Sequence, residues 1–219
     1  MGLQYVCTPD CKPVRIGLLA DSHGNLEATE QSLSVLEERG ADCIIHLGDF
    51  CDSVKNNGLA DMIRVLSHHR VVVVKGNNDH QVEKMLRDST EFLNHHRDSI
   101  LDYLADIPMT HVLDDICFAH SLPFDALRSF YEPIDIGTAW RANRLFQASP
   151  YQTLFCGHSH MPVLFRWKDG VVTREMVTPG EAVPLNPSER YIIIVGAVYE
   201  GECAILDREA LTYERVKLF

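Results

Sequence analysis

The chain has 219 residues, of which 46% are hydrophobic and 23% charged, a composition typical of a globular domain with a sizeable core. Its formal net charge of −11 argues against a polynucleotide-binding surface, because neutralising many phosphates requires abundant Lys and Arg. No apolar run is long enough to span a membrane, and residues 1–13 lack the apolar segment of a secretory leader. A small anionic ligand stays compatible with this charge, since bound divalent cations can dominate the field inside a cleft.

The seven cysteines show no spacing typical of a disulfide framework, and Cys43, Cys117 and Cys156 lie inside apolar runs. We therefore expect reduced, mostly buried thiols in a cytoplasmic protein. Cys7 and Cys11 lack a second pair that would complete a zinc site. The expected organisation is a single domain over 1–219, with 1–13 as a flexible tail.

The first half of the chain alternates strand and helix patterns. The expected elements are a strand at 14–20, a helix at 26–39 between Asn25 as N-cap and Gly40 as C-cap, a strand at 42–47, a helix at about 55–67, a strand at 70–75 and a long helix within 82–105. Nearly continuous apolar strands that alternate with helices predict a sheet covered on both faces.

The second half changes character. We expect a hairpin strand at 112–119, a helix at 134–148, a buried strand at 152–156, a strand from 163 to a turn at 168–170, a further strand after it, and strands at 191–198 and 204–207. From residue 163 onward the pattern predicts antiparallel pairing. No linker separates the two halves.

Five apolar runs are each followed at once by residue types that bind metal ions. The five groups are Asp21-Ser22-His23, Gly48-Asp49, Gly76-Asn77-Asn78-Asp79, His120, and Gly157-His158-Ser159-His160. Loops at the carboxyl ends of strands form the ligand crevice in sheets of this kind, so the five ends could deliver these residues to one point. Carboxylate oxygens and imidazole nitrogens suit Mn, Fe or Zn, and no Cys belongs to the set.

Taken singly, each motif has a more ordinary explanation. A Gly-Asp pair is usually a turn, a lone His120 is more often a satisfied core histidine, and a His-x-His can be a surface pair. Their agreement along the chain, each at a strand end, favours one shared site. Asp49 lies between the other groups in chain order and is the candidate to bridge two metals, and glycines at 48, 76 and 157 permit tight turns there.

The order of these motifs resembles that of the calcineurin-like metallophosphoesterase superfamily over 21–160, and 190–219 resembles the closing strands of its small bacterial and archaeal phosphodiesterase-type members. The resemblance implies an α/β fold, a four-layer αββα sandwich of two mixed sheets flanked by helices. It also implies two divalent metal ions, one held by Asp21, His23, Asp49 and His160 and the other by Asp49, Asn77, His120 and His158.

The function implied by the resemblance is hydrolysis of a small phosphate ester, a phosphodiester or a nucleotide-type substrate, by hydroxide that bridges the ions and attacks phosphorus in line. The expected partner is therefore a small-molecule phosphate ester, with no nucleic acid polymer and no membrane. The alternative from another class is a catalytically weak or inactive scaffold that binds proteins. A further rival is a chain that binds one structural ion.

Two departures from the family pattern concern catalysis. Many members carry a His as general acid where this chain has Asn78, and an amide cannot donate a proton as an acid. We therefore expect slower turnover and a preference for good leaving groups, or a proton delivered by water. Asp79 is expected to orient its neighbours or to cap the following helix, and His80 is a less favoured substitute donor. Ser121 replaces a common Gly after His120.

A third departure narrows the substrate. Residues 50–53 follow Gly48-Asp49 without the Asp-Arg-Gly of protein serine/threonine phosphatases, so a phosphate-binding Arg is missing there and a phosphoprotein substrate is disfavoured. The segment 122–149, rich in aromatics and Arg, could form a lid over a nucleobase, although an amphipathic helix packed on the sheet is favoured. The pairs at 68–69 and 95–96 are interpreted as solvated helix-end histidines.

Overall fold

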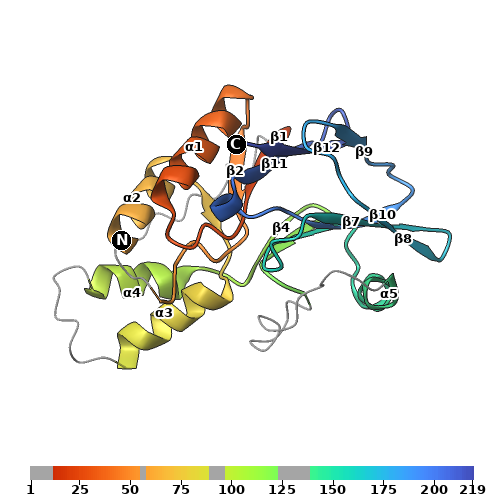
Figure 1. Cartoon of the computed structure of the whole chain (residues 1–219). Helices are drawn as coiled ribbons and strands as arrows, with labels where there is room; N and C mark the ends of the chain where they lie inside the picture. Colours follow the sequence, from red (N-terminus) through yellow and green to blue (C-terminus); the bar gives the residue numbers. More distant parts are fainter. Residues whose placement is uncertain (1–11, 55–57, 89–96, 123–138) are drawn as a thin grey trace.

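The computed structural model describes residues 12–54, 58–88, 97–122 and 139–219. Two six-stranded sheets stack face to face, with helices on the outer face of each (Figure 1). The helices in the described part are α1 (Leu26–Glu38), α2 (Leu59–His68), α3 (Asn77–Asp88), α4 (Arg97–Asp106) and α5 (Ala139–Ala148). The first four lie on the side of one sheet and α5 lies on the side of the other, which confirms the predicted four-layer sandwich.

The first sheet has the strand order β3-β2-β1-β11-β12-β9. Its strands are β1 (Arg15–Leu19), β2 (Cys43–His46), β3 (Val72–Val73), β9 (Ala182–Pro184), β11 (Glu202–Asp207) and β12 (Thr212–Lys217). The pairs β1–β2 and β2–β3 are parallel, and β11 joins β1 antiparallel. Strands from the carboxyl-terminal half therefore complete the sheet that the amino-terminal strands begin.

The second sheet has the order β4-β5-β6-β10-β7-β8. Its strands are β4 (Thr110–Leu113), β5 (Ile116–Ala119), β6 (Thr153–Cys156), β7 (Val163–Lys168), β8 (Val171–Glu175) and β10 (Arg190–Ile194). The pairs β5–β6 and β6–β10 are parallel and the others antiparallel. Both sheets are thus mixed, as predicted, and β10 differs from the expected antiparallel pattern only in its pairing with β6.

The main core fills the space between the sheets. Side chains such as Ile16 and Leu206 from the first sheet pack against Phe118, Phe155 and Ile193 from the second. Further clusters lie under α1 and under α5. Because the central strands β1, β2, β5, β6 and β10 are almost entirely buried, the centre of each sheet packs one face against its partner sheet and the other against helices.

The structure corrects three expected elements. Two helices, α3 and α4, occupy the region expected to hold one long helix; they lie side by side, and the Arg97 guanidinium donates to the Leu86 carbonyl at 2.8 Å. The expected strand at 112–119 is a hairpin of β4 and β5, which turns at Asp114 with a left-handed φ of 55°. Strand β3 is shorter than expected, with two residues, and β9 was not predicted at all.

Other expectations have mixed outcomes. Asn25 caps α1, since its Oδ1 accepts from the Ala28 N–H at 3.1 Å. None of the five described cysteines forms a disulfide. Within the part of the chain that the structure describes, every helix is too short or too polar to cross a bilayer. Predictions for Cys7, Cys11, 95–96 and most of 122–149 fall outside the described residues.

Candidate metal centre

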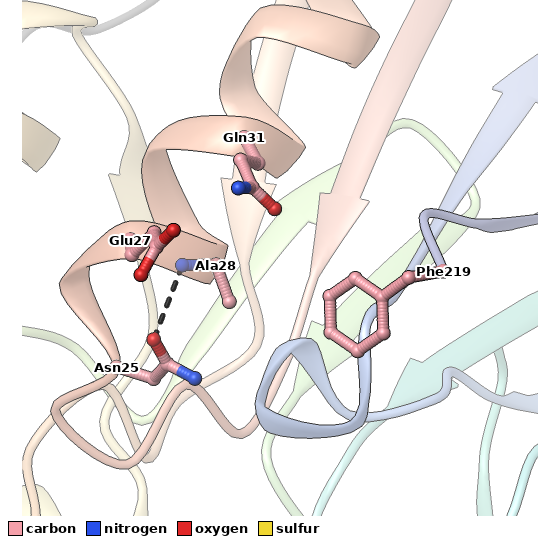
Figure 2. A pocket seen from close by; sticks show the side chains of 5 residues that line it. All are labelled: Asn25, Glu27, Ala28, Gln31 and Phe219. Carbon is pink, nitrogen blue, oxygen red and sulfur yellow. Dashed lines mark hydrogen bonds between the residues drawn. The ribbon is translucent and has the colours of Figure 1, made fainter.

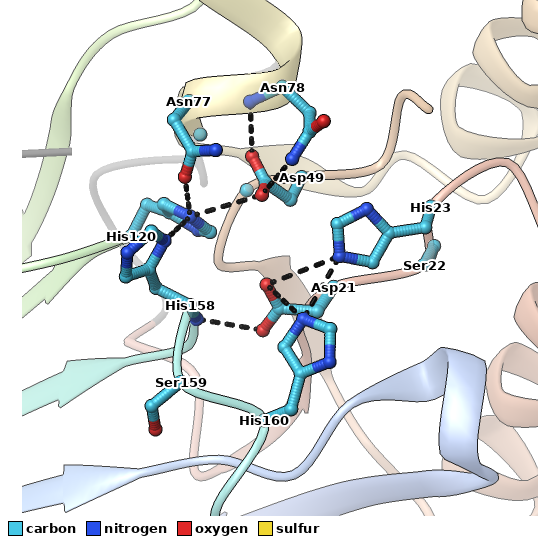
Figure 3. A network of polar contacts seen from close by, with 12 residues as sticks. Asp21, Ser22, His23, Asp49, Asn77, Asn78, His120, His158, Ser159 and His160 are labelled. Carbon is cyan, nitrogen blue, oxygen red and sulfur yellow. Dashed lines mark hydrogen bonds and ion pairs between the residues drawn. The ribbon is translucent and has the colours of Figure 1, made fainter. Parts of the chain in front are cut away.

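All five predicted motifs meet at the carboxyl ends of strands from both sheets (Figure 3). The first sheet supplies Asp21 and His23 after β1, Asp49 after β2, and Asn77 after β3 at the start of α3. The second sheet supplies the remaining histidines, His120 after β5, and His158 and His160 after β6. The predicted convergence of distant segments on one site is therefore observed.

The backbone at this site adopts left-handed conformations that non-glycine residues rarely use. Five of the seven predicted ligands have positive φ angles, namely Asp21 (54°), His23 (45°), Asp49 (58°), His158 (70°) and His160 (56°). Such residues cost free energy and persist only where the surrounding structure holds them. This clustering identifies the site as a place where the fold accepts strain to aim side chains inward.

Two glycines allow the loops to approach closely. A Cβ on Gly76 would collide with the Asp49 carboxylate, and a Cβ on Gly157 would lie 2.5 Å from Asp21 Oδ2. A side chain at either position would therefore displace a candidate ligand. The expectation that these glycines bring ligands together holds, and close approach is the reason.

The first donor cluster comprises Asp21, His23 and His160, whose ligand atoms lie within 4.8 Å of one another. The Nε2 atoms of the two imidazoles are 3.0 Å apart, and Asp21 Oδ1 lies 3.5 Å from His160 Nε2. Asp21 is fully buried, and its Oδ1 accepts no hydrogen bond from the described residues. A buried carboxylate oxygen without a donor is costly unless a cation faces it, so this cluster fits a metal ion.

The second donor cluster comprises Asp49, His120 and His158, with the Asn77 amide beside them. His120 Nε2 lies 3.0 Å from both Asn77 Oδ1 and His158 Nδ1, and 3.4 Å from Asp49 Oδ2. The other ring nitrogen, Nδ1–H, donates to the Leu47 carbonyl at 2.8 Å. When the ring is neutral, that bond leaves a lone pair on Nε2 directed at the space shared with Asp49, Asn77 and His158, as in an imidazole that binds a metal ion.

The pKa values of His120 and His158 shift in opposite directions. Burial favours neutral rings, but the Asp49 carboxylate outweighs it and raises the pKa of His120 to about 9. Burial, followed by the charge on His120, lowers the pKa of His158 to about 4. The two rings therefore share a single positive charge, which occupies the position that a metal ion suits.

The two clusters are joined by the His158 backbone. Its N–H donates to Asp21 Oδ2 at 2.8 Å, while its ring belongs to the cluster of Asp49. Asp49 itself groups with His120 and His158, and the grouping around Asp21 does not include it. Its predicted place in both ligand sets therefore stays a prediction.

Asn78 contacts Asp49 twice. Its backbone N–H donates to Asp49 Oδ1 at 2.7 Å and its side-chain amide donates to Oδ2 at 2.6 Å. Burial alone would raise the pKa of Asp49, but the charge on His120 and these hydrogen bonds lower it. Asn78 thus orients a carboxylate and keeps it ionised.

Asp79 is fully buried behind the site. Its carboxylate accepts hydrogen bonds from the backbone N–H groups of Asp49 (2.8 Å), Cys51 (2.9 Å) and Gly76 (2.8 Å). The bond from Gly76 is that of a residue in the first turn of α3 reaching back to the N-cap. Burial, followed by the charge on Asp49, raises the pKa of Asp79 to about 6. Asp79 therefore ties two ligand loops to one helix end.

One supporting residue, His46, was not predicted from the sequence. It is fully buried at the end of β2, its Nδ1 accepts from the Gly48 N–H at 3.2 Å, and its Nε2–H therefore donates to Ser22 Oγ at 2.8 Å. Burial lowers its pKa to about 4, so it stays neutral. His46 braces the loop of Asp21 against the loop of Asp49. The signal was a polar residue within an otherwise apolar strand run, 43–47.

The remaining predicted features lie apart from the donor atoms. Phe50 and Cys51 are buried in the cluster under α2–α4, so the chain after Asp49 turns toward the core. Helix α5 buries Ala142 and Phe146 against the second sheet, as the amphipathic-helix alternative requires. His69 caps α2 and its Nδ1 lies 2.6 Å from a Glu37 oxygen, consistent with a helix-end histidine.

Comparison with known proteins supports one family. A model described as the calcineurin-like phosphoesterase superfamily domain matches residues 14–200. "Phosphodiesterase YfcE" of Escherichia coli (strain K12) is 30% identical over 82 residues, which cover 33% of this chain and 44% of that protein. The chain thus spans less than half the length of the curated relatives it matches.

Solved structures are similar over nearly the whole chain. A metallophosphoesterase from Sphaerobacter thermophilus has a TM-score of 0.72 at 26% identity, with 94% of this chain and 89% of that chain covered. An archaeal phosphodiesterase has a TM-score of 0.52 at 19% identity, with 93% and 99% covered, which is a likeness of fold.

Proposed function

The chain belongs to the calcineurin-like phosphoesterase superfamily, and from that premise we propose that it hydrolyses small phosphate esters with the help of two divalent cations. One observation carries the proposal: carboxylate, amide and imidazole ligand atoms from five strand ends converge, and the buried Asp21 Oδ1 among them accepts no hydrogen bond from the described residues. Asp and His ligands without Cys suit Mn, Fe or Zn. A cluster that served only to stabilise the fold would pair its acceptors with donors from the chain.

The two donor clusters divide the proposed ligands. Asp21, His23 and His160 would hold one ion, and Asn77, His120 and His158 the other. Asp49 is the proposed shared ligand. When bound, two such ions supply Lewis acidity toward the phosphoryl oxygens and toward the attacking water.

The other side chains at the site act on orientation. Asn78 holds both oxygens of Asp49, and Asp79 fixes the loops of Asp49 and Gly76. His120 donates Nδ1–H to Leu47, which aims Nε2 at the ion. Neither Asn78 nor Asp79 is placed to protonate a leaving group, because the amide has no acidic proton and the carboxylate is occupied by backbone N–H groups. We therefore propose a preference for esters with good leaving groups.

The proposed substrate is a small phosphodiester or nucleotide-type ester. The net charge of −11 disfavours a polyanionic polymer, and the buried residues after Asp49 supply no Arg for a phosphate. The similar protein from Escherichia coli is named a phosphodiesterase, which favours a diester.

The test is hydrolysis of bis-p-nitrophenyl phosphate and p-nitrophenyl phosphate by protein supplied with Mn²⁺. We expect turnover of the diester, its loss on chelation, and its loss in Asp49→Ala. Asp169→Asn, an exposed turn residue, serves as the matched control and keeps wild-type rates. Elemental analysis should find two ions per chain.

Metal binding without turnover of either ester would contradict the proposal and favour the protein-binding scaffold. A single ion that survives in Asp49→Ala, again without turnover, would indicate a structural metal site. The ratio of the two rates separates a diesterase from a monoesterase.

A further inference from the structure

A pocket of about 290 Å³ lies beside the first turns of α1 (Figure 2). Four of the residues that line it come from the start of this helix, Asn25, Glu27, Ala28 and Gln31, and the fifth is Phe219 across from them. Its volume is just below the range of about 300–1,000 Å³ typical of drug-sized ligand sites. It therefore has room for one ring system and not for a dinucleotide.

Two chain segments connect the residues of the pocket with the first donor cluster. On one side, Asn25 follows the candidate ligand His23 by two residues. On the other side, Tyr199 places its ring edge-on to the His23 ring, with centroids 6.4 Å apart, and its backbone N–H donates to the Asp21 carbonyl at 3.2 Å. Phe219 lies against Gly201, two residues further along. The pocket and the donor cluster are thus neighbours.

The aromatic rings here are open to solvent, and the backbone turn that carries Tyr199 is anchored. Tyr199 is 58% exposed and Phe219 69% exposed. Tyr199 sits on the 3-10 turn η2 (Val198–Glu200), which is anchored by the fully buried Val198 and by the Val198 N–H bond to the Ala20 carbonyl at 2.8 Å. Exposed aromatic faces beside a polar site favour a flat apolar partner, because stacking removes their surface from water.

Polar groups opposite Phe219 define the edge of that partner. Asn25 accepts from the Ala28 N–H through Oδ1, which leaves its Nδ2 group directed away from the helix cap. Gln31 adds a second carboxamide with a donor and an acceptor. Glu27 in the pocket and Glu200 next to Tyr199 are acidic, so a second phosphate would be repelled.

We propose that this pocket binds a nucleobase, with Phe219 stacking on the base, Asn25 and Gln31 facing its edge, and Tyr199, which lies outside the pocket beside His23, contacting the part of the substrate that leads to the phosphate. The inference rests on the proposed function, in which the phosphate of the same molecule lies at the donor clusters. The substrate class is then an ester of a nucleoside monophosphate, with one base and no additional phosphate.

The kinetic test compares two esters that release the same p-nitrophenol. One is the p-nitrophenyl ester of thymidine 5′-monophosphate and the other is methyl p-nitrophenyl phosphate, which has no base. We expect Phe219→Ala and Tyr199→Ala each to lower the ratio of kcat/KM (thymidine ester over methyl ester) by about 5-fold or more, the lower end of base–aromatic stacking. Met176→Ala, which removes another exposed apolar side chain, should keep the wild-type ratio. Wild-type ratios in both aromatic variants would overturn the inference.

A binding test separates the pocket from the catalytic proposal. Adenosine, which carries no phosphate, is added to chelator-treated protein, and saturation-transfer NMR is recorded on its base protons. We expect transfer with the wild type and a loss of at least half of it in Phe219→Ala. If the wild type hydrolyses neither ester, the proposed function fails and this measurement alone decides the pocket. Absence of transfer in the wild type overturns the inference in either case.

Discussion

Two polar clusters of this molecule differ in whether their carboxylates find hydrogen-bond donors within the chain. At the far end of β7, the Arg166 guanidinium pairs with Glu175 at 2.7 Å and with Glu189 at 2.7 Å, and the Tyr191 hydroxyl donates to Glu189 at 2.8 Å. Every carboxylate of this Arg166 network therefore meets a donor from the chain. In the first donor cluster, by contrast, Asp21 Oδ1 accepts no hydrogen bond from the described residues.

The difference separates a cluster whose carboxylates are satisfied by the chain's own side chains from one in which a carboxylate oxygen is not. The Arg166 network pairs its carboxylates with the chain's own cations and holds strands together, whereas Asp21 Oδ1 in the first donor cluster has no donor from the described residues and would be satisfied by a bound cation. Removing a carboxylate should therefore change the stability of the metal-free protein in opposite directions in the two places.

The largest effect is expected for Asp21→Asn, which keeps the shape of the side chain and removes its charge. We expect turnover of the diester to fall by about 10³-fold or more, since charge stabilisation worth several kcal/mol depends on the bound ion. The metal-free variant should nevertheless unfold at a slightly higher denaturant concentration than the wild type, because an unsatisfied buried acceptor costs about 1–3 kcal/mol. Hydrolysis of bis-p-nitrophenyl phosphate with Mn²⁺ measures the turnover, and urea titration of the metal-free proteins measures the stability.

A matched substitution completes this comparison. Glu189→Gln should reduce stability equally with and without metal and leave turnover unchanged, because the Arg166 network lies apart from the ligand loops. If Asp21→Asn destabilised the metal-free protein as Glu189→Gln does, the contrast between the two regions would be wrong.

A smaller effect is expected for Asn78→His, which adds an ionisable group beside Asp49. General acid catalysis contributes about 10²–10⁴-fold, and we expect roughly 10-fold because the new imidazole also donates to Asp49. The gain should appear with phenyl phosphate and be nearly absent with p-nitrophenyl phosphate, whose leaving group needs no proton. Asn78→Ala is the control and should gain nothing on either ester. Equal effects on both esters would show that Asn78 does not limit leaving-group protonation.

Metal binding should also be visible in thermal unfolding. At a Mn²⁺ concentration of 100 times Kd, one site adds about 2.7 kcal/mol, and at about 2–4 °C per kcal/mol for a chain of this size Tm should rise by about 5–10 °C. Calorimetry of chelator-treated protein with added Mn²⁺ checks this. Asp49→Ala should lose most of the shift and Glu189→Gln should keep it. A Tm independent of Mn²⁺ would remove the basis of the comparison.

The smallest effect concerns the pH dependence of the Arg166 network. Hydrogen bonds from Arg166 and Tyr191 lower the pKa of Glu189 from 4.5 to about 2. A carboxyl whose pKa is lower in the folded state stabilises the fold above its unfolded pKa and loses that contribution as pH falls toward the folded one. The stability advantage of wild type over Glu189→Gln should therefore be full above pH 4.5 and vanish near pH 2. Denaturant midpoints across this range test it, and a constant difference would contradict it.

Much of the architecture could be predicted because it follows from local pattern. Apolar runs of strand length mark β1, β2, β5 and β6, and a polar residue directly after each run marks the ligand edge. The motif order over 21–160 led to the superfamily that the family model confirms. The fold class followed from that resemblance and is also confirmed.

What could not be predicted depends on contacts distant in sequence. The bonds from Asn78 to Asp49 require the end of β2 to meet the start of α3, which no local pattern specifies. Sequence alone likewise does not specify that the backbone partners of Asp79 come from two loops. Nor does it specify the contact of His46 with Ser22, because His46 lies within an apolar strand run. The left-handed φ of Asp21 or His160 is set by the surrounding loops and not by the residue type.

Each donor cluster joins residues from both sheets, which has a consequence for how the protein matures. The cluster of Asp21 and His23 is completed by His160, and that of Asp49 by His120 and His158. A ribosome that has released only the first hundred residues has therefore made no complete set of ligands. Under the proposed function, an ion would meet a complete set of ligands only after the loops that follow β5 and β6 have joined those of the first sheet.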